Sequence, residues 1–218
     1  MPSTNSRPKT FIHIMHKIIL SLIAALLSIT AVNAANPQAD ALLRQAADKL
    51  RNAKSVSATC AINSDGHSTQ ARIIMSGRRF RIESPGYATW FDGRTQWTYS
   101  ASTGEVTVTE PTAGELAESN PLSVIEAFTS AYNSSITSAA GDTRRISMKA
   151  RRSDAEISSA EVTLNARTTL PVSIDLTYAS GQKVAVSIEA ISTGGALPSS
   201  TFTFDKAHYP GATINDLR

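Results

Sequence analysis

Hydrophobic and polar residues alternate through most of the chain. After about residue 55, apolar side chains recur at every second position, and turn residues such as Asp65-Gly66 and Pro85-Gly86 separate the runs. This spacing is typical of strands with one buried face. It predicts strands over 56–63, 68–76, 79–83, 87–91, 95–100, 105–110, 145–150, 157–164, 171–178, 183–190 and 201–204. Because tight turns join successive strands, we expect an antiparallel sheet.

A helix is predicted before the first strand. Asn36 is a favourable N-cap, and Pro37 suits the first turn of a helix. Leu43, Ala46 and Leu50 then recur at helical spacing, so we expect a helix that ends near residue 52.

A second helical region is predicted between the two groups of strands. Thr112 and Glu115 have the spacing of a capping box, and Asn120-Pro121 again combines a cap with a first-turn proline. The apolar residues that follow are Leu122, Val124, Ile125 and Phe128. Residues 133–143 are rich in small and polar residues, so we expect a loop there.

Together these elements predict a mainly β (α+β) fold. We expect a curled antiparallel sheet that forms an incomplete β-barrel, with an N-terminal helix and a short helical lid. Two interpretations of the concave face remain open. The helices either fill it as a closed core, or they cover an apolar ligand pocket between sheet and lid.

Aromatic residues gather in the strands between residues 80 and 99. Their orientation depends on the hairpin at Asp92-Gly93-Arg94. A three-residue turn pairs Thr89 with Trp97 and places Tyr87 and Tyr99 on one face, whereas a two-residue turn shifts the pairing. We expect the three-residue turn. Under the pocket interpretation, the candidate ligand-binding side chains of the sheet are Phe80, Ile82, Tyr87, Trp97 and Tyr99, and those of the lid are Leu122, Val124, Ile125 and Phe128.

The N-terminal segment has the features of a secretory signal. Lys17 precedes an apolar run over 18–29, which is shorter than the roughly 20 residues of a membrane-spanning helix. Small residues follow, and cleavage is expected after Ala34. We therefore expect a signal peptide over 1–34, with Met15 as a second possible start, and one domain over 35–218 in the periplasm. An uncleaved anchor is the alternative.

Charge and composition exclude several classes of function. The signal segment holds three of the 21 basic residues, so the remaining 184 residues carry 18 basic and 18 acidic side chains. This balance argues against nucleic-acid binding. After residue 34, one cysteine and two scattered histidines, His67 and His208, offer no metal-ligand spacing. No nucleophile elbow or phosphate loop is present, so we expect neither catalytic residues nor a cofactor.

Two features leave alternatives open. Cys60 is either a small buried hydrophobic residue or a reactive thiol, and its alternating position favours burial. Basic clusters over 78–81 and 144–152 are either solvated strand edges or a surface for an anionic partner, and we favour the former.

Several segments, taken in order, resemble the outer-membrane lipoprotein carrier family (LolA-like proteins). They are Gly77-Arg78-Arg79-Phe80-Arg81-Ile82, Asp92-Gly93-Arg94-Thr95-Gln96-Trp97-Thr98-Tyr99, Asn120-Pro121-Leu122-Ser123-Val124-Ile125, and the C-terminal stretch from Phe202 to Asp216. The resemblance implies a monomeric periplasmic carrier whose apolar cavity binds the acyl chains of lipoproteins. It also implies transfer from an inner-membrane ABC exporter towards an outer-membrane acceptor.

One departure from the family pattern concerns the lid. Members of the family place an arginine and a proline before the aromatic strand, and that arginine latches the lid. Here Ser76 and Gly77 align with those positions, so we do not transfer the latch. A second possibility on the same fold is a periplasmic sensor or regulator that binds lipid or lipoprotein.

Overall fold

The computed structural model describes residues 36–112, 115 and 131–218. This part of the chain forms one twelve-stranded sheet, one α-helix and two short 3-10 helices. The elements, in chain order, are α2 Pro37–Asn52, β1 Ser55–Ser64, β2 His67–Ser76, β3 Arg79–Ser84, β4 Tyr87–Phe91, β5 Gln96–Ser100, β6 Glu105–Thr109, β7 Tyr132–Ser138, β8 Thr143–Ala150, β9 Ile157–Asn165, β10 Pro171–Tyr178, β11 Lys183–Gly194, η2 Ser199–Phe202, η3 Lys206–His208 and β12 Thr213–Asp216.

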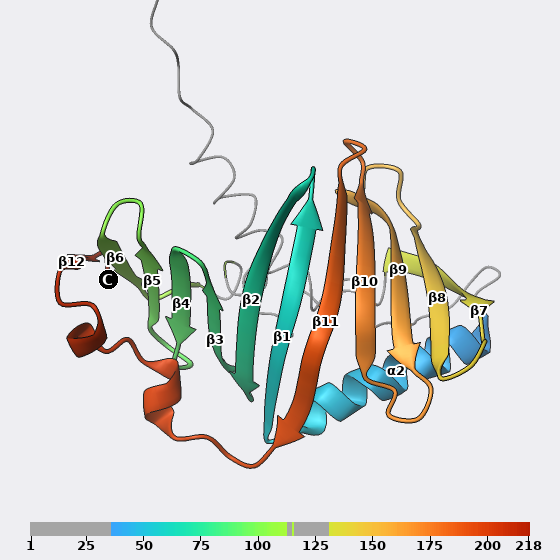
Figure 1. Cartoon of the computed structure of the whole chain (residues 1–218), viewed down its shortest axis with the longest axis horizontal. Helices are drawn as coiled ribbons and strands as arrows, with labels where there is room; N and C mark the ends of the chain where they lie inside the picture. The colour runs from blue at the N-terminus through green and yellow to red at the C-terminus, as the bar shows by residue number, and fades with distance from the viewer. Residues whose placement is uncertain (1–35, 113–114, 116–130) are drawn as a thin grey trace, which may run out of the picture.

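The sheet is open at both ends. Its strand order is β12-β6-β5-β4-β3-β2-β1-β11-β10-β9-β8-β7, so β12 and β7 are its edges. All neighbours pair antiparallel except β12, which runs parallel to β6. The prediction of a mainly β, antiparallel, incomplete barrel is therefore confirmed, with the parallel β12 as an unpredicted addition (Figure 1).

Helix α2 forms as the sequence predicts and lies along one face of the sheet, which we call the inner face. The Asn36 side chain caps the helix by accepting a hydrogen bond from the Gln38 backbone N–H at 3.0 Å. At the same end, the Ser134 hydroxyl of β7 donates to the Asp40 carboxylate, and the Asn36 backbone N–H donates to the Ser134 carbonyl at 3.2 Å. Figure 1 shows α2 running behind the strands from β1 to β7.

The main core lies between α2 and the inner face. The helix contributes Ala39, Leu43, Ala46, Ala47 and Leu50. The strands contribute side chains such as Ile62 of β1, Ile73 of β2, Val162 of β9, Ile174 of β10 and Val186 of β11. Their alternation in sequence is what places them on one face.

A second, smaller core lies on the outer face of β3–β6. The register of β4 with β5 pairs Trp90 with Trp97, so both indoles point away from the face that carries Phe80. Residues 195–218 return across this outer face, where the buried ring of Phe202 lies 4.8 Å from the Arg79 guanidinium. Phe204 and Tyr209 pack edge-on against Trp90, with ring centroids 5.5 and 5.6 Å apart.

The apolar side of the sheet therefore changes at β4, whose Phe91 points inward while its Trp90 points outward. In β1–β3 and β8–β11 the apolar side chains point inward, whereas in β5 and β6 they point outward. The outward set is Trp97, Tyr99, Val106 and Val108, and Ala88 and Trp90 of β4 point the same way. The opposite, inner positions of β5 and β6 are Gln96, Thr98, Ser100, Glu105, Thr107 and Thr109.

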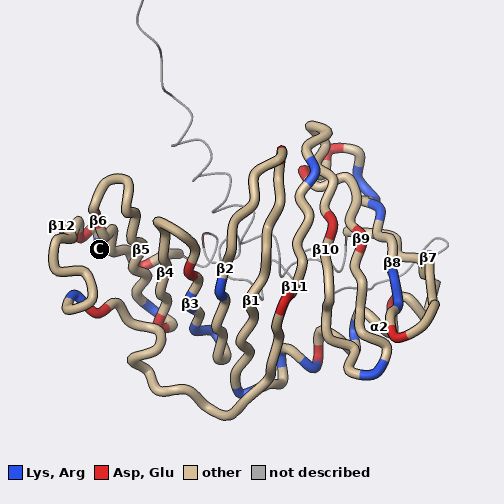
Figure 2. The backbone as a smooth tube through the Cα atoms, viewed as in Figure 1, with Lys and Arg blue, Asp and Glu red and all other residues tan. Residues whose placement is uncertain are grey.

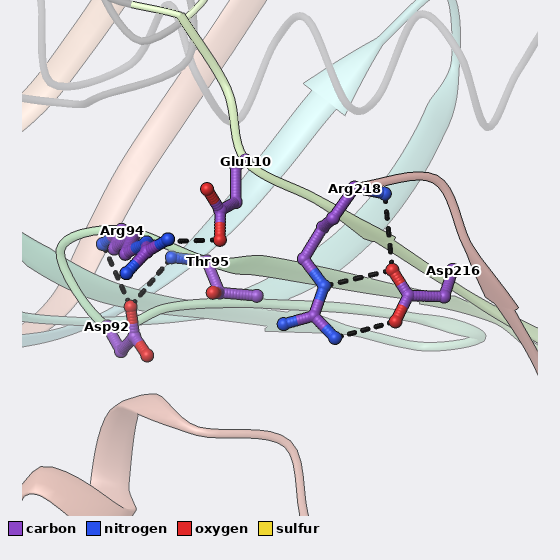
Figure 3. A network of polar contacts seen from close by, with 6 residues as sticks. All are labelled: Asp92, Arg94, Thr95, Glu110, Asp216 and Arg218. Atoms are coloured by element: carbon purple, nitrogen blue, oxygen red, sulfur yellow. Dashed lines mark hydrogen bonds and ion pairs between the residues drawn. The ribbon is translucent and has the colours of Figure 1, made fainter.

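The turn between β4 and β5 corrects one prediction. It is a four-residue loop, because Phe91 pairs with Gln96 and the Asp92 backbone N–H donates to the Thr95 carbonyl at 3.2 Å. The Asp92 carboxylate accepts hydrogen bonds from the Arg94 and Thr95 backbone N–H groups, both at 2.8 Å (Figure 3). The expected three-residue turn is wrong, and so is the pairing derived from it.

The C-terminal strand ends beside this loop. Arg218 and Asp216 form an ion pair at 2.6 Å, and Arg94 pairs with Glu110 at 3.1 Å (Figure 3). Surface ion pairs of this kind contribute little stability by themselves. The parallel ladder with β6 and the aromatic contacts therefore hold the C-terminal segment on the sheet.

Two further expectations are wrong. The sequence predicts a loop over 133–143, but residues 132–138 form the edge strand β7. Ser and Thr side chains are tolerated here because β7 is an edge strand, which pairs with β8 on one side only. Its Ser134 contacts the N-terminal end of α2. No strand forms at 201–204: Thr201 and Phe202 end the 3-10 helix η2, and the chain bends there to insert Phe202 into the outer core.

We predict that the outer core is a necessary part of the fold. Phe202→Ala should lower the free energy of unfolding by about 3–5 kcal/mol, because the phenyl ring is fully buried. Val172→Ala, at a position that is 39% exposed, should change it by no more than about 0.5 kcal/mol. Urea denaturation measures both, and equal losses would contradict the packing of residues 195–218 on the sheet.

Candidate functional site

An apolar pocket lies between the C-terminal end of α2 and the inner face. It has a volume of about 40 Å³. Its described lining consists of Leu50, Val56, Ala58, Cys60, Ile73, Met75, Pro171, Ile174, Val186, Ile188 and Ile191. The strands β1, β2, β10 and β11 supply most of this lining. β1 and β2 contribute alternate residues, whereas register shifts interrupt the alternation in β10 and β11.

The pocket lining is chemically uniform. None of the described lining residues carries a charge or a side-chain hydroxyl or amide. The arrangement can therefore exclude water and contact hydrocarbon, but the lining offers nothing that would orient a charged ligand. A β-bulge between Thr59 and Cys60 brings Ile188 and Ile191 to the same side of the sheet.

Cys60 is part of this lining and is only 2% exposed. Burial, followed by the negative charge of Glu189, raises the pKa of its thiol from 9.0 to about 11. The Cys60 Sγ contacts the Ala71 carbonyl at 3.6 Å. Of the two alternatives left open by the sequence, these observations favour the small buried hydrophobic residue over the reactive thiol.

Three of the predicted sheet residues lie on the inner face. Phe80 and Ile82 are 1% and 2% exposed, and both belong to the main core. Phe80 also packs against Phe91, with ring centroids 5.3 Å apart. Tyr87 shares this face at the far end of β4, and burial raises the pKa of its phenol although hydrogen bonds with Thr89 and Thr98 lower it.

Two predicted residues lie elsewhere. The sequence predicts that Trp97 and Tyr99 share a face with Tyr87, but the observed register places them on the outer face. Tyr99 there packs against Tyr209, with ring centroids 4.6 Å apart. The four-residue loop shifts the pairing by one position relative to the expected turn, and a shift of one residue exchanges the two faces of a strand.

The predicted lid residues Leu122, Val124, Ile125 and Phe128, and the cleavage site Ala34, fall outside the described residues. The capping box before that segment is described and confirmed. The Glu115 carboxylate accepts hydrogen bonds from the Thr112 backbone N–H and hydroxyl, both at 2.8 Å, and these bonds lower the pKa of Glu115.

The positions that align with the family's latch have a structural use here. The Ser76 hydroxyl donates to the Lys54 carbonyl at 2.8 Å and accepts from the Arg79 guanidinium at 3.2 Å. Gly77 follows with a φ of +58°, as the turn into β3 requires. These contacts tie the start of β1 to the β2–β3 turn.

Sequence reasoning missed the half of the pocket that β10 and β11 supply. Ile174, Val186 and Ile188 lie in alternating runs that could have indicated them, whereas the bulge takes Ile191 out of that alternation. Their proximity to α2 depends on the pairing of β1 with β11, which joins residues more than 100 positions apart. No local pattern specifies such a pairing.

Charged residues are distributed over the described surface. Figure 2 shows basic and acidic positions interspersed along the strands. Members of both basic clusters pair with acids: Arg81 with Glu83 at 2.5 Å, and Arg145 with Glu161 at 3.3 Å. Residues 36–112, 115 and 131–218 contain no group of three potential metal ligands. Within the same ranges no helix has the length and hydropathy needed to cross a bilayer.

The fold and the apolar inner face agree with comparisons to known proteins. Residues 27–182 match the family model described as outer membrane lipoprotein carrier protein LolA. Because the match covers more than half of the chain, the protein belongs to this family. Membership supports a role in binding lipid or lipoprotein. No curated protein matches the sequence.

The solved structures that align with this chain are distant from it in sequence. An uncharacterized conserved protein from Thermus thermophilus aligns with a TM-score of 0.56 at 12% identity, over 82% of this chain and 99% of that one. MucB aligns with a TM-score of 0.47 at 15% identity, over 78% and 64%. The LolA superfamily protein NE2245 from Nitrosomonas europaea gives 0.37 at 12% identity, over 76% and 97%.

We predict that the Cys60 thiol is protected in the folded protein. At pH 9.0, the ordinary pKa of the thiol, a thiol reagent should modify the folded protein at least about 100-fold more slowly than the protein in guanidinium chloride. The raised pKa also means that the contribution of the neutral thiol to stability is present below pH 9 and is lost as the pH rises towards about 11. Cys60→Ala should reduce the pH-dependent loss in this range, because only the part from tyrosines with raised pKa values, such as Tyr87 and Tyr132, then remains. An equal slope in both proteins would contradict the assignment.

Proposed function

We propose that this protein is a periplasmic carrier that binds the acyl chains of lipoproteins against the inner face of its sheet. It would take them from an inner-membrane ABC exporter and deliver them towards the outer membrane. The proposal rests mainly on one observation: an uninterrupted apolar inner face over β1–β3 and β9–β11, in a member of the lipoprotein carrier family.

An acylated protein needs such a surface to cross an aqueous compartment. Burial of each methylene is worth about 0.8 kcal/mol, so a long acyl chain in water costs roughly 10 kcal/mol. An apolar face that accepts the chain removes this cost without any covalent step. In this proposal the protein needs no cofactor and no catalytic residue.

The small pocket volume bears on how the ligand enters. The pocket of about 40 Å³ is far below the roughly 300–1,000 Å³ of typical ligand sites. An acyl chain must therefore displace side chains that close the pocket. Opening the pocket separates apolar side chains that pack together in the empty protein, and this cost offsets part of the gain from the ligand. The compensation keeps binding reversible, as a carrier requires.

The pocket side chains of β1, β2, β10 and β11 and the inner-face residues Phe80 and Ile82 would contact the chain. Leu122, Val124, Ile125 and Phe128 keep the ligand-binding role predicted from the sequence. Export would follow from cleavage of the signal peptide after Ala34.

Filling the pocket should block binding. We predict that Ala58→Leu lowers affinity for a fluorescent acyl probe at least about tenfold, because the added carbons occupy the space an acyl chain would use. Ala61→Leu is the matched control, since Ala61 pairs with Gln70 and Ser187 on the outer face of the same strand. Fluorescence titration measures both affinities.

The control decides how the result is interpreted. Thermal unfolding establishes that both variants fold. Equal affinities for Ala58→Leu, Ala61→Leu and the unchanged protein would move the acyl site away from this pocket.

The transport role is tested in the bacterium. Depletion of the protein should leave outer-membrane lipoproteins in the inner membrane, as detected by membrane fractionation and immunoblotting. Expression of the unchanged protein should restore sorting and Ala58→Leu should not. Normal sorting in the depleted strain would exclude transport, and capture of a membrane signalling partner without the exporter would favour the sensor hypothesis.

A further inference from the structure

The inner face of β4 and β5 differs chemically from the rest of the inner face. Next to the apolar side chains of Phe80, Ile82 and Phe91, the register places Tyr87 and Thr89 of β4 beside Ser100 and Thr98 of β5, and Gln96 beside Phe91. None of these polar side chains is charged. The apolar face therefore ends at a row of hydroxyl and amide groups.

Most of this row is internally hydrogen-bonded. The Thr89 hydroxyl, which is 2% exposed, donates to the Tyr87 phenol oxygen at 3.0 Å. The Gln96 amide N–H donates to the Thr98 hydroxyl at 3.5 Å, which is a long hydrogen bond. The groups therefore have a defined arrangement before any ligand arrives.

Two atoms at the ends of the row lack a partner within the described part of the chain. Gln96 Oε1 and Ser84 Oγ are buried and make no hydrogen bond with the described residues. Ser84 pairs with Tyr87 on the inner face, and Gln96 pairs with Phe91. Buried polar atoms are normally satisfied, and an unsatisfied one costs free energy in the empty protein. The two atoms lie at opposite ends of β4, so a single donor on a ligand would recover the cost at only one of them.

We propose that the Phe91 end of this row, formed by Gln96 and Thr98, is a subsite for the amide linkage of an N-acylated ligand. The site is uncharged, so it does not select a phosphate or carboxylate. The free acceptor at Gln96 needs a donor, which an amide N–H supplies and an ester does not. The adjacent Phe80 and Phe91 accept the hydrocarbon chain attached to that amide.

This subsite deepens the proposed function and rests on it. In the carrier, the inner face would hold the acyl chain through apolar contact area alone. The polar row would set how far the acyl chain enters. It would also distinguish a molecule acylated on nitrogen from a lipid acylated only through esters. Discrimination of this kind depends on hydrogen bonds that one ligand leaves unmade.

Two probes of equal chain length test the proposal. N-methyldodecanamide has an N–H group where methyl dodecanoate has an ester oxygen, and the two are otherwise alike. Each is titrated as a competitor of a bound fluorescent acyl probe. We expect the unchanged protein to bind the amide about fivefold more tightly than the ester. In Gln96→Leu the preference should fall to about one, through weaker binding of the amide alone.

Matched variants separate the subsite from general effects on the fold. Gln70→Leu makes the same change at an exposed outer-face position and should keep the preference. Gln96→Leu and Ser84→Ala each remove an unsatisfied buried atom, so both should unfold at the same temperature as the unchanged protein or higher. Ser84 pairs with Tyr87, four residues of β4 or roughly 13 Å from the Gln96 end, so Ser84→Ala should keep the preference and serves as a second control.

The outcomes separate the two proposals. Equal affinities for amide and ester in the unchanged protein, or a preference that persists in Gln96→Leu, would overturn the subsite and leave the carrier proposal standing. If neither competitor displaces the probe from the unchanged protein, the acyl-binding proposal fails and the subsite fails with it.

Discussion

The fold depends on which side of the sheet each strand buries. From β7 to β3 the apolar side chains point inward, on the face that α2 covers, and in β5 and β6 they point outward against the C-terminal segment. Strand β4 contributes to both faces, with Phe91 inward and Trp90 outward. A single continuous sheet thus takes part in two cores on opposite faces. Because hydrophobic burial is the main stabilising term, each half needs its own cover, α2 on one side and Phe202, Phe204 and Tyr209 on the other.

This change of face also defines the boundaries of the candidate site. An inner face that remained apolar as far as β6 would offer hydrocarbon contact along its whole width. Instead, the polar positions of β5 and β6 limit the apolar region to the strands from β3 towards β9. A ligand with a long chain and a neutral polar linkage matches both parts, and the proposed carrier function and the amide subsite use this single boundary.

Sequence reasoning predicted most strands, helix α2 and the capping box at Thr112, because each follows from local patterns of alternation, capping or turn residues. It also placed Phe80 and Ile82 correctly on a buried face. It failed where a single residue of register decided the outcome. Trp97 and Tyr99 have the same alternation whichever way they point, so their face depended on the length of the Asp92–Thr95 loop.

The sequence by itself determined the class of the protein: a curled sheet with one amphipathic helix, a near-neutral chain after residue 34, and the ordered segments of the lipoprotein carrier family. Only the tertiary structure decided which strands line the pocket, because the pairing of β1 with β11 and of β12 with β6 joins segments far apart in the chain. The alternation of apolar and polar residues in the sequence determines that one face of a strand is apolar. The partner that covers that face is set by long-range packing, which no local pattern encodes.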